Sequence, residues 1–555
     1  MNMKVLYQLT FVVLIAQLFL TNNSFAQLSE TKSKDSILSH KIVKDAKGEI
    51  IAWYKPEIPG AAYAQVAKLA SEFLLKSCPK DEKTGLPFYL VTCCFQKPKL
   101  NENKYVAEDW LHNPACFFAG CVQSFAVDYY NFTGDVQYIE FVRGLLDHQL
   151  QFGTTEKGWF WENVPYSSSN PFEKEYRGGT KWEHQGMRGD GLHGIEPDKV
   201  GELGYGYLRF FEITGDEKYL NAALSCARAL AKHVRVEKIE SSPFIEIHSL
   251  QSPWPFRVNA RTGAVISEYC SNSLDPIKLL DELIRIKDVI RLDTGDFRQI
   301  KIARNAAYNW LFSRLGPMHT YIWNGYFEDI QNDPLASNRV QITPGELAKH
   351  ILKNPEFDKN YDKDVPALIH WIRSVFKTDG MNAIKEQTYC FEPMGSHTAR
   401  YGSLCAMWYE KSGDEWYKNE AYKYLNFASY MTLPDGFVAV GPNWPGAWFS
   451  DGYSDYVRHY IDAMAAIPEW APQNENHLLR STSIVKGIKY EQNKIELNTF
   501  DPTSVLKFKL KKKPIKIKVN NLEVKIDGKD CSWTIMNNGG VLTLKAKGNQ
   551  VHIVL

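Results

Sequence analysis

The chain has 555 residues, of which 44% are hydrophobic and 13% aromatic, and 65 Lys and Arg residues nearly balance 64 Asp and Glu residues. This length predicts one very large domain or two ordinary ones. A formal net charge of +1 gives no electrostatic reason to expect a nucleic-acid partner. The aromatic residues, many beside Gly and Pro in expected loops, are of the kind that stack on sugar rings.

The ten cysteines include no CxxC pair, so neither a zinc site nor a thioredoxin-like motif is expected. Cys93 with Cys94, and Cys116 with Cys121, are candidates for disulfides in an oxidising compartment. Small buried thiols are the alternative.

The N-terminus reads MNMK, then an apolar run from Val5 to Leu20, then small residues at Ser24 and Ala26. This pattern predicts a cleaved secretory signal over residues 1–26. No cysteine follows it, so no lipoprotein anchor is expected. No later stretch approaches the roughly 18 apolar residues that a membrane helix needs. We therefore expect an exported protein, periplasmic or secreted, without a membrane span.

Four segments share a Gly-Asp pair between two apolar-periodic stretches: FTGDVQYIEF at 132, ITGDEKYLNAA at 213, DTGDFRQIKIA at 293 and KSGDEWYKNEA at 411. Gly fits the left-handed position after a helix, and Asp accepts the free amides at the next N-terminus. Each segment therefore predicts a helix, a tight turn and an antiparallel helix. The helical period is clearest in one apolar stripe, made of Tyr219, Ala223, Ala227, Leu230 and Val234.

The first three of these aspartates are about 80 residues apart, so long loops must separate the hairpins. Further helix pairs are expected near Tyr63, around PALIHWIRSVF at 366 and after Asp451. Roughly six hairpins between 63 and 470 predict a mainly α fold, an (α/α)6-type toroid over residues 27–472. An open solenoid is the alternative, but long aromatic loops favour a ring with one functional face.

After Pro472 the residues alternate between apolar and polar, as in KIELNTF, VLKFKL and GGVLTLKAK, with Asn, Gly and Asp turns between the runs. This pattern predicts a small antiparallel β domain over residues 473–555. The lysines of KFKLKKKPIKIK are expected mainly on the solvated face, where they protect a sheet edge. Attraction of an anionic polymer is the alternative role.

Three stretches carry more polar groups than a helical repeat requires. The first, residues 182–207, contains Trp182, His184, Arg188, Asp190, His193, Glu196 and Glu202. The second, residues 256–272, contains Arg257, Arg261, Glu268, Tyr269 and Asn272. The third pairs CFEPMGSHTARYG with PNWPGAWFSDGYSDYVRHY and contains Glu392, His397, Arg400, Tyr401, Trp448, Asp451, Tyr453 and Asp455. Ordinary surface turns, and helix capping by the aspartates, are the structural alternative.

Two reactions suit these residues. Glycoside hydrolysis needs two carboxylates flanking the bond, and the candidates are Asp190, Glu196, Glu392 and Asp451. Elimination from a uronic acid needs an Arg for the sugar carboxylate, a base for the C5 proton and an acid for the group leaving C4. Spacings of three and four predict that His397, Arg400 and Tyr401 share one helical face and supply this set.

The signal, the hairpins with their Gly-Asp turns, the WFSDGYSDY loop and the C-terminal β domain together resemble the exported (α/α) toroid enzymes that act on uronic-acid polysaccharides. Toroid-type polysaccharide lyases are similar in plan, as are the β-glucuronidases of glycoside hydrolase family 154. The resemblance covers nearly the whole mature chain. The Asn, His, Tyr and Arg set of the lyases would correspond to Asn272, His193 or His397, Tyr401 and Arg400.

We therefore predict an enzyme that processes uronic-acid saccharides by β-elimination, as a lyase or dehydratase. A carboxylate-pair β-glucuronidase and a non-catalytic carbohydrate-binding protein are the alternatives. The predicted catalytic residues are His397, Tyr401, His193, Asp190 and Asp451. The predicted substrate-binding residues are Arg400, Arg188, Arg261, Asn272, Glu268, Tyr453, Trp448 and Trp182. The expected partner is an anionic oligo- or polysaccharide. No metal or other cofactor is expected, and the oligomeric state is left open.

Overall fold

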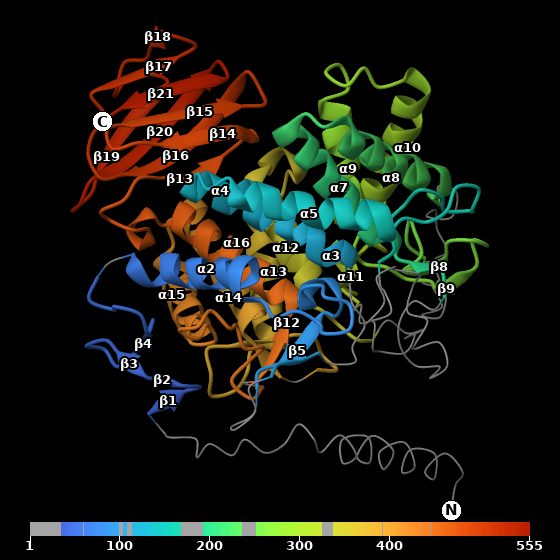
Figure 1. Cartoon of the computed structure of the whole chain (residues 1–555), viewed down its shortest axis with the longest axis horizontal. Coiled ribbons are helices and arrows are strands. Elements are labelled where there is room, and N and C mark those ends of the chain that lie inside the picture. Colours follow the sequence, from blue (N-terminus) through green and yellow to red (C-terminus); the bar gives the residue numbers. More distant parts are fainter. Residues whose placement is uncertain are drawn as a thin grey trace, which may run out of the picture.

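The computed structural model describes residues 35–58, 60–98, 104–107, 114–167, 192–235, 251–324, 337–390, 392–444 and 446–555. The expected signal at 1–26 and three predicted site residues, Trp182, Arg188 and Asp190, lie outside these ranges. Helices extend from α2 (Ala61–Glu72) to α16 (Ser450–Ala466), and strands then continue from β13 (His477–Ser481) to β21 (Gln550–Val554). The predicted helical toroid followed by an antiparallel β domain is confirmed (Figure 1).

The inner wall of the ring is built from helices that follow one another around a central axis. They are α3 (Pro114–Cys121) with its continuation η3 (Val122–Tyr129), α7 (Pro197–Thr214), α9 (Leu274–Arg285), α12 (Ile342–Lys353), α14 (Gly395–Ser412) and α16. α7 packs against α3 and α9, and α14 packs against α12 and α16. α16 in turn packs against α3 and η3, so the ring closes and is not an open solenoid.

The outer helices pack on this wall through apolar stripes. They are α2, α5 (Gln137–Phe152), α8 (Glu217–His233), α10 (Thr294–Leu311), α13 (Tyr361–Phe376) and α15 (Glu415–Ser429). α8 buries Tyr219, Ala223, Ala227 and Leu230, as predicted. Val234, the last residue of the predicted stripe, is the C-cap residue and lies just beyond the helix.

Three of the four Gly-Asp segments form the predicted turn. Gly134, Gly215 and Gly413 end α4 (Tyr130–Thr133), α7 and α14 with φ angles of 73°, 76° and 69°. Asp216 and Asp414 then cap α8 and α15, because their side chains accept hydrogen bonds from the amides of Lys218 and Trp416. These connections are short because the capping residues of both helices are adjacent in sequence.

The third segment was predicted wrongly. α10 begins at Thr294, and its cap is Asp293, whose Oδ1 accepts from the amides of Gly295 (2.7 Å) and Asp296 (3.2 Å). The preceding helix, α9, has already ended at Arg285. Gly295 therefore lies inside the first turn of α10 and does not end a helix.

The connections differ in length at the two ends of the ring. An inner helix reaches the next outer helix through a turn such as Gly215–Asp216 or Gly413–Asp414. An outer helix returns to the next inner helix through a long segment, for example 377–394 before α14 and 430–449 before α16. The long segments therefore gather where the inner helices begin. We call this the loop end, and the opposite end the turn end.

The C-terminal β domain consists of two antiparallel sheets, ordered β13-β16-β20-β19 and β14-β15-β21-β17-β18. Their strands are β14 (Val485–Tyr490), β15 (Lys494–Thr499), β16 (Thr503–Leu510), β17 (Lys516–Val519), β18 (Leu522–Glu523), β19 (Cys531–Ile535) and β20 (Gly540–Lys547). The domain covers the turn end of the ring (Figure 1). The ring of His477 stacks on Phe132 with centroids 3.7 Å apart, and Lys507 Nζ lies 2.7 Å from Glu410 at the end of α14.

This packing corrects part of the lysine prediction. Lys507 joins the β domain to the ring, and Lys509 is completely buried, with its Nζ 2.7 Å from the carbonyl of Asn538. Lys511, Lys512 and Lys513 are exposed, as predicted. A strand that packs on another domain buries part of its outward face, which alternation within the strand does not reveal.

Short strands before α2 were not predicted: β1 (Ser36–Ile37), β2 (His40–Lys41), β3 (Val43–Lys44) and β4 (Ile50–Ile51). They pack near α15, where Trp53 Nε1 donates to the carbonyl of Ser429 (2.7 Å). All ten cysteines lie in described ranges and are free thiols, so neither candidate disulfide forms. Among the described helices, none is long and apolar enough to cross a membrane.

Candidate active site

At the loop end of the ring most inner helices begin without a capping side chain, and in α16 the Asp451 carboxylate itself interacts with the amides of Asp451 and Gly452. The N-cap residues of α7, α9, α12, α14 and α16 make no side-chain capping bond, whereas aspartates cap the outer helices α8, α10 and α15. Amides in the first turn have no partner within their own helix, and the helix dipole places positive charge there. The loop end is therefore suited to bind anionic or oxygen-rich groups.

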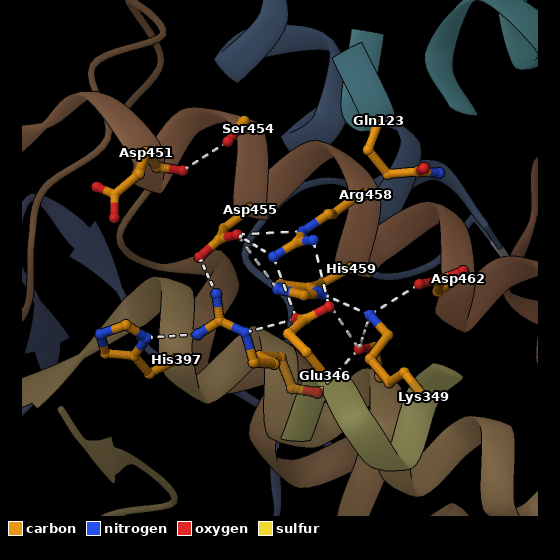
Figure 2. Close-up of polar contacts among 12 residues, drawn as sticks. Gln123, Glu346, Lys349, His397, Asp451, Ser454, Asp455, Arg458, His459 and Asp462 are labelled. Carbon is orange, nitrogen blue, oxygen red and sulfur yellow. Dashed lines mark hydrogen bonds and ion pairs between the residues drawn. The ribbon is translucent and has the colours of Figure 1, made fainter. Parts of the chain in front are cut away.

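Just inside this end, two arginines and two carboxylates form a buried network (Figure 2). Arg400 on α14 donates to Asp455 Oδ2 (2.6 Å), to Glu346 Oε1 (2.9 Å) and to His397 Nδ1 (2.7 Å). Arg458 on α16 donates to the same two carboxylates, at 2.9 Å from Asp455 Oδ1 and 3.1 Å from Glu346 Oε1. The network thus connects α12, α14 and α16 across the ring interior.

The charges in this network are compensated within the protein. Burial alone would raise the pKa of Asp455 and of Glu346, but the neighbouring arginines hold both well below their usual range. The guanidinium of Arg400 is 4% exposed and has its three nitrogens engaged. The predicted role of Arg400, binding of a sugar carboxylate, would require it to exchange these partners.

His397 is held as a neutral hydrogen-bond donor. Burial and the Arg400 charge lower its pKa to about 3. Because Arg400 donates to Nδ1, the ring proton must be on Nε2. Within the described structure Nε2 makes no hydrogen bond, although Glu386 Oε1 lies 3.5 Å away. In this state His397 has no free lone pair with which to act as a base.

Tyr401 does not join His397 and Arg400. Its ring packs edge-on against Tyr424 of α15 with centroids 4.7 Å apart, and its hydroxyl donates to Glu420 Oε2 at 3.4 Å. Consecutive residues on a helix point in different directions. Arg400 therefore faces the ring interior while Tyr401 faces the outer helix, and the predicted triplet is divided between two sides of α14.

Asp451 is the predicted residue whose setting best suits proton transfer. It lies in the first turn of α16 at the loop end, with an exposed side chain that pairs with no described basic residue. The surrounding protein and the nearby Asp455 charge raise its pKa to about 6. In Figure 2 its carboxylate points away from the Asp455 and Arg458 side chains. A carboxyl with this pKa changes protonation state near neutral pH.

Below the arginine network the interior remains charged toward the turn end. Lys349 Nζ lies 2.7 Å from Asp462 Oδ2 and donates to His459 Nδ1 (2.7 Å) and Ser403 Oγ (3.2 Å) (Figure 2). Burial is the main cause of a pKa below the usual value for both Lys349 and His459. These contacts link α12, α14 and α16, although His459 Nε2 makes no hydrogen bond among the described residues and lies 3.5 Å from Asp455 Oδ1.

Predicted residues on the opposite wall are also held by partners. Arg257 on β8 (Arg257–Asn259) donates to Glu196 Oε1 at 2.9 Å, and both side chains are buried. Asn272 is buried before α9 and donates to Asp275 (2.9 Å) and Asp198 (3.2 Å). The amide of Asn272 therefore already serves two carboxylates.

The other predicted residues lie in varied settings. His193, with a φ of 63°, precedes β7 (Gly194–Ile195) and packs edge-on against Trp159 at 4.6 Å. Arg261 is exposed in the turn between β8 and β9 (Val265–Ser267), and Glu268 is exposed and pairs with Arg235 at 2.7 Å.

Two aromatic residues predicted to bind substrate lie in the core. Trp448 on β12 (Ala447–Phe449) and Tyr453 on α16 are 0% exposed. Trp448 packs on Phe95 of β5 (Cys94–Gln96) with centroids 3.8 Å apart, and Tyr453 packs on Trp448. Both rings pack in the core behind the loop end, so neither exposes a face on which a sugar could stack.

The network contains residues that were not predicted: Glu346, Lys349, Arg458, His459 and Asp462. A signal was present, because Asp451, Asp455, Arg458 and Asp462 recur every three or four residues along α16. A polar stripe at helical spacing indicates either a solvated face or a polar interior. Only the closed ring distinguishes the two.

No protein-family model matches the chain, and no curated protein matches it. Solved structures similar to it include a D-mannose isomerase, with 11% identity, coverage of 74% of this chain and 96% of that chain, and a TM-score of 0.48. A cellobiose 2-epimerase from Spirochaeta thermophila has 8% identity, coverage of 73% and 97%, and a TM-score of 0.47. An unsaturated glucuronyl hydrolase specific for heparin has 12% identity, coverage of 73% and 96%, and a TM-score of 0.40. These matches assign no family to the chain.

Proposed function

We propose that this protein is a carbohydrate-processing enzyme that cleaves a glycosidic bond beside a uronate at the loop end of the ring. The observation that carries the proposal is the position of Asp451, an exposed carboxyl in the first turn of α16, one turn before Asp455 of the arginine network. It stands beside a charge-compensated network that keeps neighbouring groups in fixed protonation states. Asp451 is the group that transfers a proton.

Hydrolysis is the reaction that this geometry supports best. Glycosidases use carboxyl groups as acid and base, and they separate the two pKa values through the environment of each group. Asp451 is ionised above about pH 6 and then accepts a proton from the attacking water. The elimination set of His397, Arg400 and Tyr401 is less favoured, because Tyr401 faces α15 and Arg400 is already paired.

Elimination is kept as the second candidate because of one observation. His397 carries its proton on Nε2, and that atom makes no hydrogen bond within the described residues. A small movement of Glu386 or of the loop before α14 would let this N–H donate to a uronate carboxylate. Asp451 would then take the C5 proton.

The uronate preference rests on helix N-termini at the loop end whose N-cap residues make no capping bond, those of α12 and α14 among them. Several positive helix ends directed at one space favour a carboxylate over a neutral hydroxymethyl group. We therefore expect glucuronate- or galacturonate-containing saccharides to be better substrates than the corresponding neutral sugars.

The test is product analysis with uronate-containing oligosaccharides. Hydrolysis gives products whose summed mass exceeds that of the substrate by one water, with no new ultraviolet absorbance. Elimination gives products with no added water and the absorbance of a C4–C5 double bond. Binding without any product would contradict the enzyme proposal and favour a carbohydrate-binding protein.

A further inference from the structure

Glu202 is an inner-wall carboxyl that forms no ion pair with an arginine among the described residues. It lies on α7 and is 21% exposed. One carboxylate oxygen, Oε2, is 3.2 Å from Lys199 Nζ, and Oε1 receives a weak hydrogen bond from Cys116 Sγ at 3.8 Å. Glu346 and Asp455, in contrast, are each held by two arginines.

The contacts of α7 and α16 with α3 show where Glu202 and Asp451 lie relative to each other along the axis of the ring. α7 approaches α3 at Gly206, where a Cβ would lie 3.5 Å from Ala119 Cα. α16 approaches the adjacent residue of α3, Gly120, where a Cβ would lie 2.9 Å from Ser454 Oγ. The two contacts are therefore at one level of the ring.

Both carboxyls lie about one helical turn above this level, toward the loop end. Glu202 precedes Gly206 by one turn of α7, and Asp451 precedes Ser454 by about one turn of α16. Because α7 and α16 are the two inner neighbours of α3, Glu202 and Asp451 lie at similar height on either side of that helix.

The charge of Glu202 also affects the pKa of Arg458 across the ring interior. Burial disfavours the charge on Arg458 of α16, but Glu346, Asp455 and, from α7, Glu202 raise its pKa. α7 and α16 are separated by α3 in the wall, so this interaction runs through the interior and not through a shared helix contact. Burial raises the pKa of Glu202 to about 7, although Lys199 opposes the shift.

We propose that Glu202 is the second catalytic carboxyl, an inference that rests on the proposed hydrolase function. Glu202 is then the acid that protonates the leaving glycosidic oxygen, and Asp451 is the base. The water oxygen bonds to the anomeric carbon as its proton passes to Asp451. The bond from the anomeric carbon to the glycosidic oxygen breaks, and that oxygen takes the proton of Glu202. Release of one proton from Asp451 and uptake of one by Glu202 restore the enzyme.

The test compares two glucuronides with different leaving groups. A sugar alcohol must be protonated as it leaves, whereas nitrophenolate is stable without a proton. Glu202→Gln should lower kcat/KM about 10²–10⁴-fold on a glucuronyl disaccharide and less than tenfold on the nitrophenyl glucuronide. Asp451→Asn should impair both substrates. Glu217→Gln, an exposed glutamate at the start of α8, is the matched control and should change neither.

The unaltered protein supplies a second readout that does not depend on a variant folding. Since Glu202 must be protonated, kcat/KM on the disaccharide should fall as pH rises through about 7. This alkaline limb of the pH profile should be absent from kcat/KM on the nitrophenyl substrate. Equal losses on both substrates in Glu202→Gln, or the same alkaline limb for both, would overturn the assignment of Glu202. Absence of hydrolysis by the unaltered protein would instead overturn the proposed function.

Discussion

Two aspartates on one helix, Asp451 and Asp455, lie in contrasting electrostatic settings. Asp455 is buried and held by Arg400 and Arg458, which keep its pKa well below the usual range despite burial. Asp451, one turn earlier, has no such partner, and its pKa is raised to about 6. The charge of Asp455 contributes to that shift, so the structural pair helps to set the protonation of the exposed carboxyl.

At the same scale, Tyr401→Phe tests whether the tyrosine takes part in proton transfer. Its hydroxyl makes a long contact, 3.4 Å to Glu420, on the side of α14 that faces α15, and also interacts with Cys405. We expect kcat/KM to change less than threefold and stability to fall by about 1 kcal/mol. A rate loss above 10²-fold with an unchanged unfolding transition would show that Tyr401 reaches the substrate and would restore the elimination triplet.

The sequence indicated where some predicted site residues lie along their helices, but not which residues they pair with. Asp451 and His397 were selected because polar side chains began expected helices, and both lie at the loop end. Spacing along α14 could not reveal that Arg400 is paired with residues of α12 and α16, because those contacts span 54 and 55 positions. Trp448 and Tyr453 were misjudged since Gly- and Pro-rich sequence near an aromatic residue does not indicate whether its ring packs inward.

At the scale of elements, local capping chemistry builds the short connections at the turn end of the ring. Adjacent Gly and Asp residues close the turn end at α7–α8 and α14–α15. This chemistry is local, so the sequence predicted it well. The turn prediction was wrong at residues 293–296 because α9 ends earlier than expected, and where α9 ends depends on packing.

Two glycine substitutions test whether Gly215 forms the turn between α7 and α8. They are expected to change the free energy of unfolding in opposite directions. Gly215 has a φ of 76° and no atom near an added Cβ, so Gly215→Ala should destabilise by about 1 kcal/mol through backbone strain alone. Gly144 lies inside α5 with equal free space and no positive φ, so Gly144→Ala should stabilise by about 0.5–1 kcal/mol. Urea unfolding measures both. Equal signs for the two variants would contradict the turn assignment.

At the scale of the whole molecule, buried histidines in the ring make stability depend on pH. His350 on α12 and His397 on α14 both have pKa values lowered to about 3, mainly by burial. The ordinary value is about 6.5. Their contribution to stability is therefore complete above about pH 6.5 and is lost as pH falls toward 3.

His350→Gln isolates one part of this dependence. His350 lies outside the proposed reacting groups, and its ring packs edge-on against Phe357. The unaltered protein should lose stability between pH 6.5 and 4.5, and the variant should lose less, by on the order of 1 kcal/mol at pH 5. Thermal unfolding across this range measures the difference. An identical pH profile for both proteins would show that His350 is not held neutral by the fold.

The variant Asp451→Asn must remain folded for its activity to be informative, and the raised pKa predicts that it does. A carboxyl whose folded-state pKa is raised contributes stability that is lost as pH rises through about 6. Asparagine removes this loss, so at pH 8 the variant should unfold at a temperature no lower than that of the unaltered protein.

The central claim is that Asp451 transfers the proton in glycosidic cleavage, and its most direct test is kcat/KM of Asp451→Asn on a uronate-containing oligosaccharide. Asp288→Asn, at a carboxyl whose side chain is 89% exposed, is the matched control. We predict a loss of about 10²–10⁴-fold for Asp451→Asn and no change for Asp288→Asn. Activity within threefold of the unaltered protein in a folded Asp451→Asn variant would contradict the account.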